Sequence, residues 1–270
     1  MRMNWIPKNL FSTVRGVLSG PTLTLVLVVT SPTSVRADEA DAKSILKSMS
    51  DYIASQDAIS FGYDASLEVI TKDDQRLALV SSGTVSLDRP GNIHTTRSGG
   101  FADTETFFDG KTLTLLGKTA NIYLQVDAPG SIDDLIDMME SKLDRSPPAA
   151  HLLLSNPYDR LMEGVTDVKD LGSGVIGGVE CDFLAFRAGE IDWQIWVAHG
   201  DKPYPCKYVV TSKDIAGGPQ YSIQFNNWMT GSDAETGGFV FENTTSATQI
   251  EAADLAGKMS ELPGHFKTGE

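Results

Sequence analysis

The residue types that most often carry chemistry are scattered along this chain. The four histidines, His94, His151, His199 and His265, have none of the short spacings that bring two imidazoles to one metal ion. The chain contains no G-x-S-x-G, no H-E-x-x-H and no P-loop sequence. We therefore expect no metal, no cofactor and no enzymatic activity. A hydrolase stays a weaker alternative, because the members of a catalytic triad need not be close in sequence.

Two local patterns resemble functional motifs. Residues 172–177 read G-x-G-x-x-G, but the strand-like VECDFLAF follows them, whereas a dinucleotide site requires a helix. These glycines therefore indicate a hairpin turn. Asp133, Asp134 and Asp137 could be acid–base groups, but acidic residues in a first helical turn are also favoured by the helix dipole. We interpret them as that first turn.

The first 37 residues have the features of a cleaved secretory signal. Basic residues come first, LTLVLVV (residues 23–29) is apolar, and Val35-Arg36-Ala37 is typical of a cleavage site. A membrane anchor is the alternative, but the uninterrupted apolar run has 7 residues, and spanning a bilayer takes roughly 20. We predict a signal peptide over 1–37, one domain over 38–250 and a polar tail over 251–270. The protein is then expected in the periplasm of a Gram-negative bacterium.

Charge and cysteine content narrow the partners further. The chain has 36 acidic and 22 basic residues and a net charge of −14, so nucleic acid is a poor partner. Export into an oxidising compartment predicts a disulfide between Cys181 and Cys206. The disulfide is geometrically unfavourable if these residues lie on strands that flank a third one, because their Cα atoms would be about 10 Å apart. A disulfide needs less than about 7 Å, so a twist, a bulge or a frayed register must close the gap.

Periodicity predicts an antiparallel α+β fold. Residues 38–57 have helical spacing, SIDDLIDMMESKLD (131–144) predicts a second helix that Ser131 caps, and AAHLLLS (149–155) is a further helical piece. The remaining segments alternate with period two and predict about eleven strands. They include FGYDASLEV, KTLTLL, IDWQIWVA, CKYVVTS, QYSIQFNNW and GFVFEN. Helices do not separate successive strands, which argues against a doubly wound parallel sheet.

The stretch DWQIWVAHGDKPYPCKY (192–208) predicts a β-hairpin with two different faces. Trp193 shares its face with Ile191, Ile195 and Val197, whereas Trp196 shares its face with Asp192 and Gln194. We therefore expect Trp193 on a covered, concave side and Trp196 outside or at a rim.

Together with other strands, this hairpin makes one sheet face continuously apolar. The helices must cover that face, and they form either a filled core or the wall of a ligand cavity. Sequence periodicity does not distinguish a filled core from a ligand cavity. The candidate lining residues are Tyr63, Leu67, Met139, Ile191, Trp193, Ile195, Tyr221, Ile223 and Phe225.

Five segments carry a resemblance to a known family: FFDGKTLTLL, PPAAHLLLSNPY, GVECDFLAFR, DWQIWVAHGDKPYPCKY and PQYSIQ. Over roughly residues 45–250 the chain resembles a bacterial family of predicted periplasmic proteins without an assigned function. That family is similar to the outer-membrane lipoprotein carriers. The resemblance implies a half-open antiparallel β-barrel whose concave apolar face is covered by helices and holds acyl chains.

The resemblance favours a non-enzymatic periplasmic carrier or sensor of a lipid-like or other hydrophobic ligand. Membrane contact would be transient at most. The alternative is a module that binds envelope proteins through its rim or edge and has a fully packed core.

Overall fold

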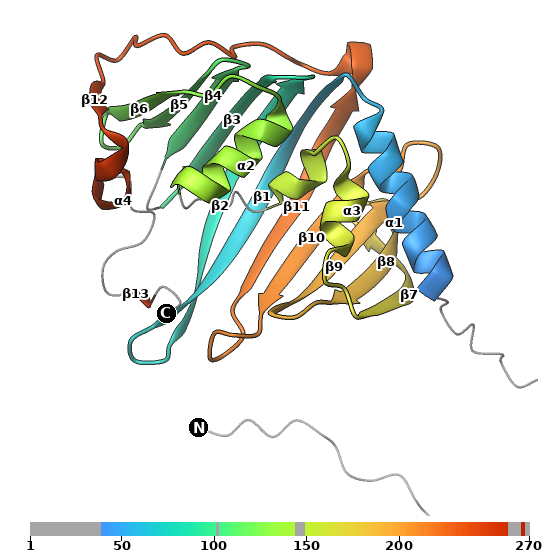
Figure 1. The fold of residues 1–270 in the computed structure, drawn as a ribbon. Helices are drawn as coiled ribbons and strands as arrows, with labels where there is room; N and C mark the ends of the chain where they lie inside the picture. Colours follow the sequence, from blue (N-terminus) through green and yellow to red (C-terminus); the bar gives the residue numbers. More distant parts are fainter. Residues whose placement is uncertain (1–38, 101–102, 144–148, 259–265, 268–270) are drawn as a thin grey trace, which may run out of the picture. The chain divides into compact units, whose positions relative to one another are not determined.

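One continuous sheet contains all the strands of the described chain. The strand order in this computed structural model is β12-β6-β5-β4-β3-β2-β1-β11-β10-β9-β8-β7, and β13 pairs with β1 (Figure 1). Neighbouring strands are antiparallel, except that β12 runs parallel to β6. The structure describes residues 39–100, 103–143, 149–258 and 266–267, which all belong to the unit Ala37–Glu270.

The strands fall into two groups along the chain. The first group is β1 (Ala58–Thr71), β2 (Arg76–Asp88), β3 (Asn92–Gly99), β4 (Thr104–Asp109), β5 (Thr112–Gly117) and β6 (Ile122–Asp127). The second is β7 (Asp167–Ile176), β8 (Val179–Arg187), β9 (Ile191–Ala198), β10 (Pro205–Ser212) and β11 (Gln220–Thr230), followed by β12 (Thr248–Ile250) and β13 (Phe266–Lys267). The groups meet where β1 pairs with β11.

The main helices lie on one face of the sheet. They are α1 (Glu39–Ala54), α2 (Ile132–Leu143), the short 3-10 helix η1 (Ala150–Leu153) and α3 (Pro157–Met162). Figure 1 shows α1 and α3 over the β7–β10 half of the curved sheet and α2 over the half that contains β2 and β3. The prediction of an α+β fold with a half-open antiparallel sheet covered by helices is confirmed, since the described strand path does not close on itself.

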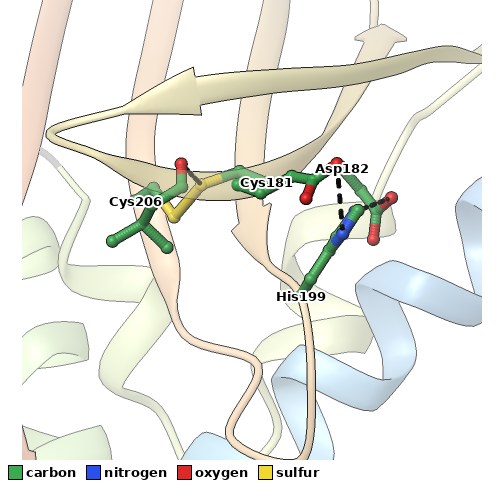
Figure 2. Close-up of a disulfide and its surroundings, with 6 residues drawn as sticks. Cys181, Asp182, His199 and Cys206 are labelled. Carbon is green, nitrogen blue, oxygen red and sulfur yellow. Dashed lines mark hydrogen bonds and ion pairs between the residues drawn. A yellow bond between two sulfur atoms is a disulfide. The ribbon is translucent and has the colours of Figure 1, made fainter.

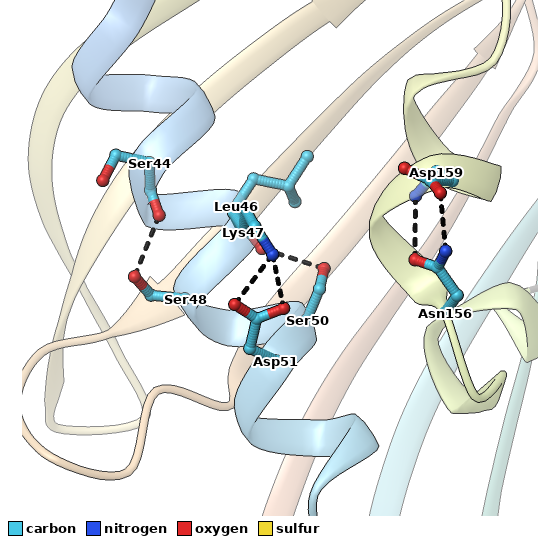
Figure 3. Close-up of polar contacts among 8 residues, drawn as sticks. All are labelled: Ser44, Leu46, Lys47, Ser48, Ser50, Asp51, Asn156 and Asp159. Atoms are coloured by element: carbon cyan, nitrogen blue, oxygen red, sulfur yellow. Dashed lines mark hydrogen bonds and ion pairs between the residues drawn. The ribbon is translucent and has the colours of Figure 1, made fainter.

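Helix α1 is amphipathic, and its apolar side is fully covered. Ala42, Leu46, Met49 and Ile53 are each 0% exposed. The opposite side is held by local polar contacts, among them the Lys47–Asp51 ion pair at 2.7 Å and the hydrogen bond from the Ser48 hydroxyl to the Ser44 carbonyl at 2.9 Å (Figure 3). On α3, Asn156 caps the helix by accepting from the Asp159 amide. These helices therefore present their apolar sides to the sheet.

The predicted strand GFVFEN (238–243) is wrong. This segment is not a strand, and Phe241 instead packs its ring against Phe107 at 5.5 Å and Tyr123 at 4.9 Å between centroids. Phe107 alternates with the inward-facing Thr106 and Phe108, so Phe241 covers the opposite, convex face of the sheet. The alternation in the sequence was real, but it marks aromatic packing rather than backbone pairing.

The beginning of the segment that we assigned to a polar tail packs against the sheet. It contains the short helices η3 (Ala252–Asp254) and α4 (Leu255–Lys258), and Leu255 is only 3% exposed. The predicted signal peptide lies outside the described residues. Within the described ranges, no helix has the length and apolar character needed to cross a bilayer.

Candidate functional site

A cavity of about 610 Å³ lies between α2 and the concave face of the sheet. Its floor comes from β1 to β5 and from β11, and its cover comes from α2, η1 and α4. Most of the wall is apolar, with Phe61, Val85, Ile93, Leu135 and Phe225 among its residues. Ligand pockets in proteins are commonly about 300–1,000 Å³ and mostly apolar. The cavity therefore has the size and the surface of a site for a hydrophobic ligand.

Reciprocal hydrogen bonds fix the first turn of α2. The Asp134 amide donates to the Ser131 hydroxyl at 3.2 Å, and the Asp134 carboxylate accepts from the Ser131 amide at 2.8 Å. The Ser131 backbone and hydroxyl donors lower the pKa of Asp134. Asp133 accepts from the backbone amide of Ser155 at 3.0 Å, and so ties α2 to the segment that follows η1. Asp133 and Asp134 are therefore structural residues of the first turn, as we interpreted them, whereas Asp137 lies beyond that turn.

A half-buried arginine also anchors the cover. Arg89, in the turn between β2 and β3, donates to the carbonyls of Leu153 at 2.9 Å and Gln56 at 3.2 Å. Burial lowers its pKa, and the charges of Asp133 and Asp57 oppose that shift. These bonds connect the turn to the end of η1 and to the residues after α1. The cover is thus attached to the sheet at the end where α2 begins.

The structure separates the predicted lining residues into two sets. Tyr63, Leu67, Met139, Tyr221, Ile223 and Phe225 lie on the wall of this cavity. Ile191, Trp193 and Ile195 do not, although they belong to the same sheet face. The two sets are connected by one row of opposite residues across the sheet. In this row Leu67 is opposite Tyr221, Tyr221 is opposite Val210, and Val210 is opposite Trp193.

The prediction that the cavity is also lined by Ile191, Trp193 and Ile195 needs correction, because α1 packs on this part of the sheet. Helix α1 lies directly on β7 and β9, so this part of the face is a filled core. Trp193 is 2% exposed and stacks on Phe186 at 3.8 Å between ring centroids. Trp196 points to the other face, is half-buried, and stacks on Phe183 at 4.3 Å. The predicted hairpin and the opposite orientations of its two tryptophans are confirmed.

Sequence reasoning missed part of the wall. Arg97, Thr104 and Lys142 line the cavity, and so do Ile132 and Leu135. The apolar pair could have been found, because it shares the helical face of Met139. Arg97 and Thr104 alternate with outward-facing residues on strands whose pairing is not visible in the sequence, so only the register reveals them.

The predicted disulfide between Cys181 and Cys206 is present (Figure 2). Their Cα atoms are 7.0 Å apart, less than three flat strands would give. A bulge explains the difference. Pro205 is opposite Val197 and Lys207 is opposite Trp196, so Cys206 is an extra residue in β10. Cys181 is opposite Ala198, where β9 ends, and the bond passes that end of the strand.

Two histidines have acidic neighbours, but neither pair forms a nucleophile–base arrangement in the described part of the chain. His199 is 2.6 Å from Asp182 beside the disulfide (Figure 2), and His151 is 2.8 Å from Glu140. No described serine or threonine hydroxyl donates to either imidazole, and both cysteines are in the disulfide. The described ranges also hold no group of three His, Cys, Asp or Glu residues that could bind a metal ion.

A third histidine is enclosed on the convex face. His94 stacks on Phe107 at 4.7 Å, and its Nε2 atom is buried without a hydrogen-bond partner. Burial lowers the pKa of His94; the charge of Glu105 raises it and that of Lys118 lowers it again. The neutral imidazole is therefore the form that this packing favours.

The glycine-rich stretch ends in the predicted turn, whereas Gly172 and Gly174 lie within strand β7. Gly177 and Gly178 connect β7 to β8, and their φ angles are 58° and 87°. Positive φ at both central residues is typical of tight hairpin turns and explains the glycine pair. No helix follows it, so the motif does not form a dinucleotide site.

Comparisons with known proteins give a family and several similar folds. Among solved structures, LprF from Mycobacterium bovis is 13% identical, with a TM-score of 0.44, over 74% of this chain and 100% of that one. The Pseudomonas aeruginosa MucA/MucB complex gives 16% identity and a TM-score of 0.40 over 73% of this chain and 59% of the matched one. A LolA superfamily protein from Nitrosomonas europaea is 10% identical, with a TM-score of 0.33, over 71% of this chain and 94% of that one.

No curated protein matches the chain. A family described as "Predicted periplasmic protein (DUF2092)" matches residues 42–253, which is most of the chain and includes every strand that borders the cavity. The chain therefore belongs to the DUF2092 family of predicted periplasmic proteins.

Proposed function

We propose that this protein binds a lipid-like or other hydrophobic ligand in the cavity beneath α2, as a periplasmic carrier or sensor. The observation that carries the proposal is the apolar cavity of about 610 Å³ on the concave face of the sheet. Tyr63, Leu67, Met139, Tyr221, Ile223 and Phe225 are the predicted residues that would contact the ligand. The chemistry required is burial, not bond making or breaking.

The energetics favour an alkyl chain in such a site. Each methylene that leaves water contributes about 0.8 kcal/mol, so a chain of about 14 methylenes gains roughly 11 kcal/mol before the costs of association. Those costs are about 4–15 kcal/mol, depending on how they are estimated. Even with the smallest of these costs, such a chain keeps a net free energy of about −7 kcal/mol, which corresponds to a dissociation constant of about 10 μM.

The alternative of an interaction module with a packed core is less well supported. A fully packed core leaves no space of this size beneath its helices, and protein interiors are close-packed. The family's description supports a periplasmic location. Cleavage of a signal peptide after Ala37 and a domain over 38–250 stay our predictions.

The proposal is tested with protein purified from its own periplasm and analysed by native mass spectrometry with lipid extraction. We expect a co-purifying amphiphile that denaturation releases. After its removal, the protein should bind a fluorescent fatty-acid probe, and binding should tighten about fourfold per added methylene until the chain fills the cavity. A protein that carries no amphiphile and binds no probe of any chain length would contradict the proposal.

A further inference from the structure

Two threonines lie at the inner end of the cavity. Inward-facing residues that are opposite one another form rows across β1 to β5. The first row is buried and consists of Ile59, Leu87, Ile93, Phe108 and Leu113. The second row consists of Phe61, Val85, Thr95, Thr106 and Leu115. Every residue of the second row lines the cavity, whereas only Ile93 of the first row does. The second row is therefore where the cavity ends.

The cavity opens at the opposite end. Helix α2 begins beside the first row, where the Ile132 amide donates to the carbonyl of Pro90, just after β2, at 2.9 Å. From Ile132 to Lys142 the helix rises about 15 Å. Lys142 lines the cavity and is exposed, so it marks where the cavity meets solvent. A ligand that enters there reaches Thr95 and Thr106 with its leading part.

The surroundings of the two threonines are mostly apolar. Val85 is opposite Thr95, Leu115 is opposite Thr106, and both of these apolar side chains are at most 9% exposed. The cover contributes Leu135, Ile136 and Met139 of α2 to the cavity wall. Arg97 belongs to the next row toward the opening, where its Nε atom donates to the Ser81 hydroxyl at 3.4 Å. The second row itself contains no charged side chain.

Neither threonine hydroxyl has a hydrogen-bond partner in the described part of the chain. On the convex face, by contrast, the hydroxyls of Thr84 and Thr96 lie 2.8 Å apart, and Thr114 accepts from the Gln125 amide group at 3.0 Å. Thr95 and Thr106 are half-buried, so water can reach them only through the cavity. A ligand that displaces this water must replace its hydrogen bonds, or affinity is lost.

We propose that the ligand carries an uncharged oxygen group, a hydroxyl or a carbonyl, in its most deeply bound part, and that Thr95 and Thr106 bind this group. This inference rests on the proposed ligand-binding function and adds the chemical class and the orientation of the ligand. Thr95 is directly opposite Thr106, and Cβ atoms of opposite residues are about 4.5–5.5 Å apart, so both hydroxyls can reach one oxygen.

The chemistry of the pair favours a neutral group. A threonine hydroxyl both donates and accepts, so the pair suits an alcohol as well as a carbonyl. A carboxylate at this position would lose its hydration without gaining an opposite charge from the second row, which is strongly disfavoured. An ionised ligand therefore keeps its charged end at the solvent-exposed opening, away from the two threonines.

The test removes only the hydroxyls. Thr95→Val and Thr106→Val keep the branched shape that suits a strand. The neutral probe N-phenyl-1-naphthylamine is displaced from delipidated protein by decane, decan-1-ol, decan-2-one or decanoate at about pH 8, where the carboxylate is ionised. The affinity of each compound is compared between variant and wild type, so that the compound's own hydration cancels.

The four compounds should respond differently. Each variant should bind decanol and decanone roughly threefold to tenfold more weakly than wild type, because one neutral hydrogen bond is lost. Decane should bind more tightly to the variants, since it can no longer leave a hydroxyl without a partner. Decanoate should change little. A loss for only one of the two oxygen compounds also supports the proposal and identifies the group as hydroxyl or carbonyl.

A matched control uses the same substitution outside the cavity. Thr112 is also a strand threonine, on β5, but it does not line the cavity. Thr112→Val should leave all four affinities unchanged. Circular dichroism checks that each variant is folded, and the two lining variants test the pair independently if one of them does not fold.

The outcomes separate this inference from the proposed function. Unchanged affinities for decanol and decanone in both lining variants overturn the role of the threonines and leave hydrophobic binding intact. An equal loss for decane overturns it as well, because decane has no oxygen. A loss for decanoate as large as that for decanol overturns the neutral class and indicates a buried anion. Failure of all four compounds to displace the probe from wild-type protein contradicts ligand binding itself.

Discussion

Two aromatic residues on the same sheet face should respond differently to truncation. Trp193 is 2% exposed and stacked on Phe186 under α1, so its removal leaves a void in a filled core. Phe225 is 8% exposed but already borders the cavity, so fewer packing partners are lost. We expect Trp193→Ala to lower the free energy of unfolding by about 4–5 kcal/mol and Phe225→Ala by about 2–3 kcal/mol. The difference follows from what covers each side chain.

The measurement is urea unfolding of delipidated protein followed by far-ultraviolet circular dichroism. Delipidation matters because a ligand that binds only the folded state adds to its apparent stability. The loss for Trp193→Ala is a large part of the 5–15 kcal/mol that a domain of this kind typically has. The binding comparison therefore uses milder variants, Trp193→Phe and Phe225→Leu, which keep most of the apolar surface.

In folded protein, Phe225→Leu should change the affinity for a fatty-acid probe and Trp193→Phe should not. The reasoning is refuted if Trp193→Phe changes the affinity as much as Phe225→Leu does. It is also refuted if the two alanine variants lose the same free energy of unfolding. The first result would mean that the face under α1 is open to ligand, as the sequence analysis expected for Trp193, and the second would mean that the two side chains are equally well packed.

Three further expectations concern the rest of the chain. Replacing Cys181 and Cys206 with serine should lower the free energy of unfolding by about 3.5 kcal/mol, from the loop-entropy relation and the separation of 25 residues; equal denaturation midpoints would contradict this. The pKa of His94 is lowered from its ordinary 6.5, so the unfolded chain binds more protons below about pH 6.5 and stability should fall there. His94→Phe should remove that part of the pH dependence. N-terminal sequencing of exported protein should give Asp38, and an intact Met1 would disprove cleavage.

The local pattern of the sequence was sufficient for most elements. Alternation predicted the strands from β1 to β11, and it assigned Trp193 and Trp196 to opposite faces. These features depend on neighbours within one strand. GFVFEN failed because the same alternation also suits an extended segment that packs its Phe241 on other rings. Backbone pairing is a property of two segments, and one segment's pattern cannot distinguish the two cases.

The site needed information that spans the whole chain. The residues of the apolar face were evident, but which helix covers which half was not, and so Ile191, Trp193 and Ile195 were placed in the cavity. Arg97 looked like an ordinary residue in a strand. Its position opposite Gly83 and Thr104 depends on the register of three strands. The disulfide likewise depended on a bulge at Cys206 that no pattern indicates.

The pairing of β1 with β11 has a consequence for how the chain folds. Ile59 is opposite Thr230, so the centre of the sheet joins two segments from nearly opposite ends of the domain. As the chain is synthesised from its N-terminus, β1 to β6 can assemble early as a meander, but one edge of β1 stays unpaired until β11 arrives. Non-local pairing of this kind slows folding, and an exposed strand edge beside an apolar face is prone to intermolecular pairing. The step most vulnerable to aggregation is therefore the late closure at β1, so substitutions in β11 should reduce the yield of folded protein more than equally destabilising ones in β5.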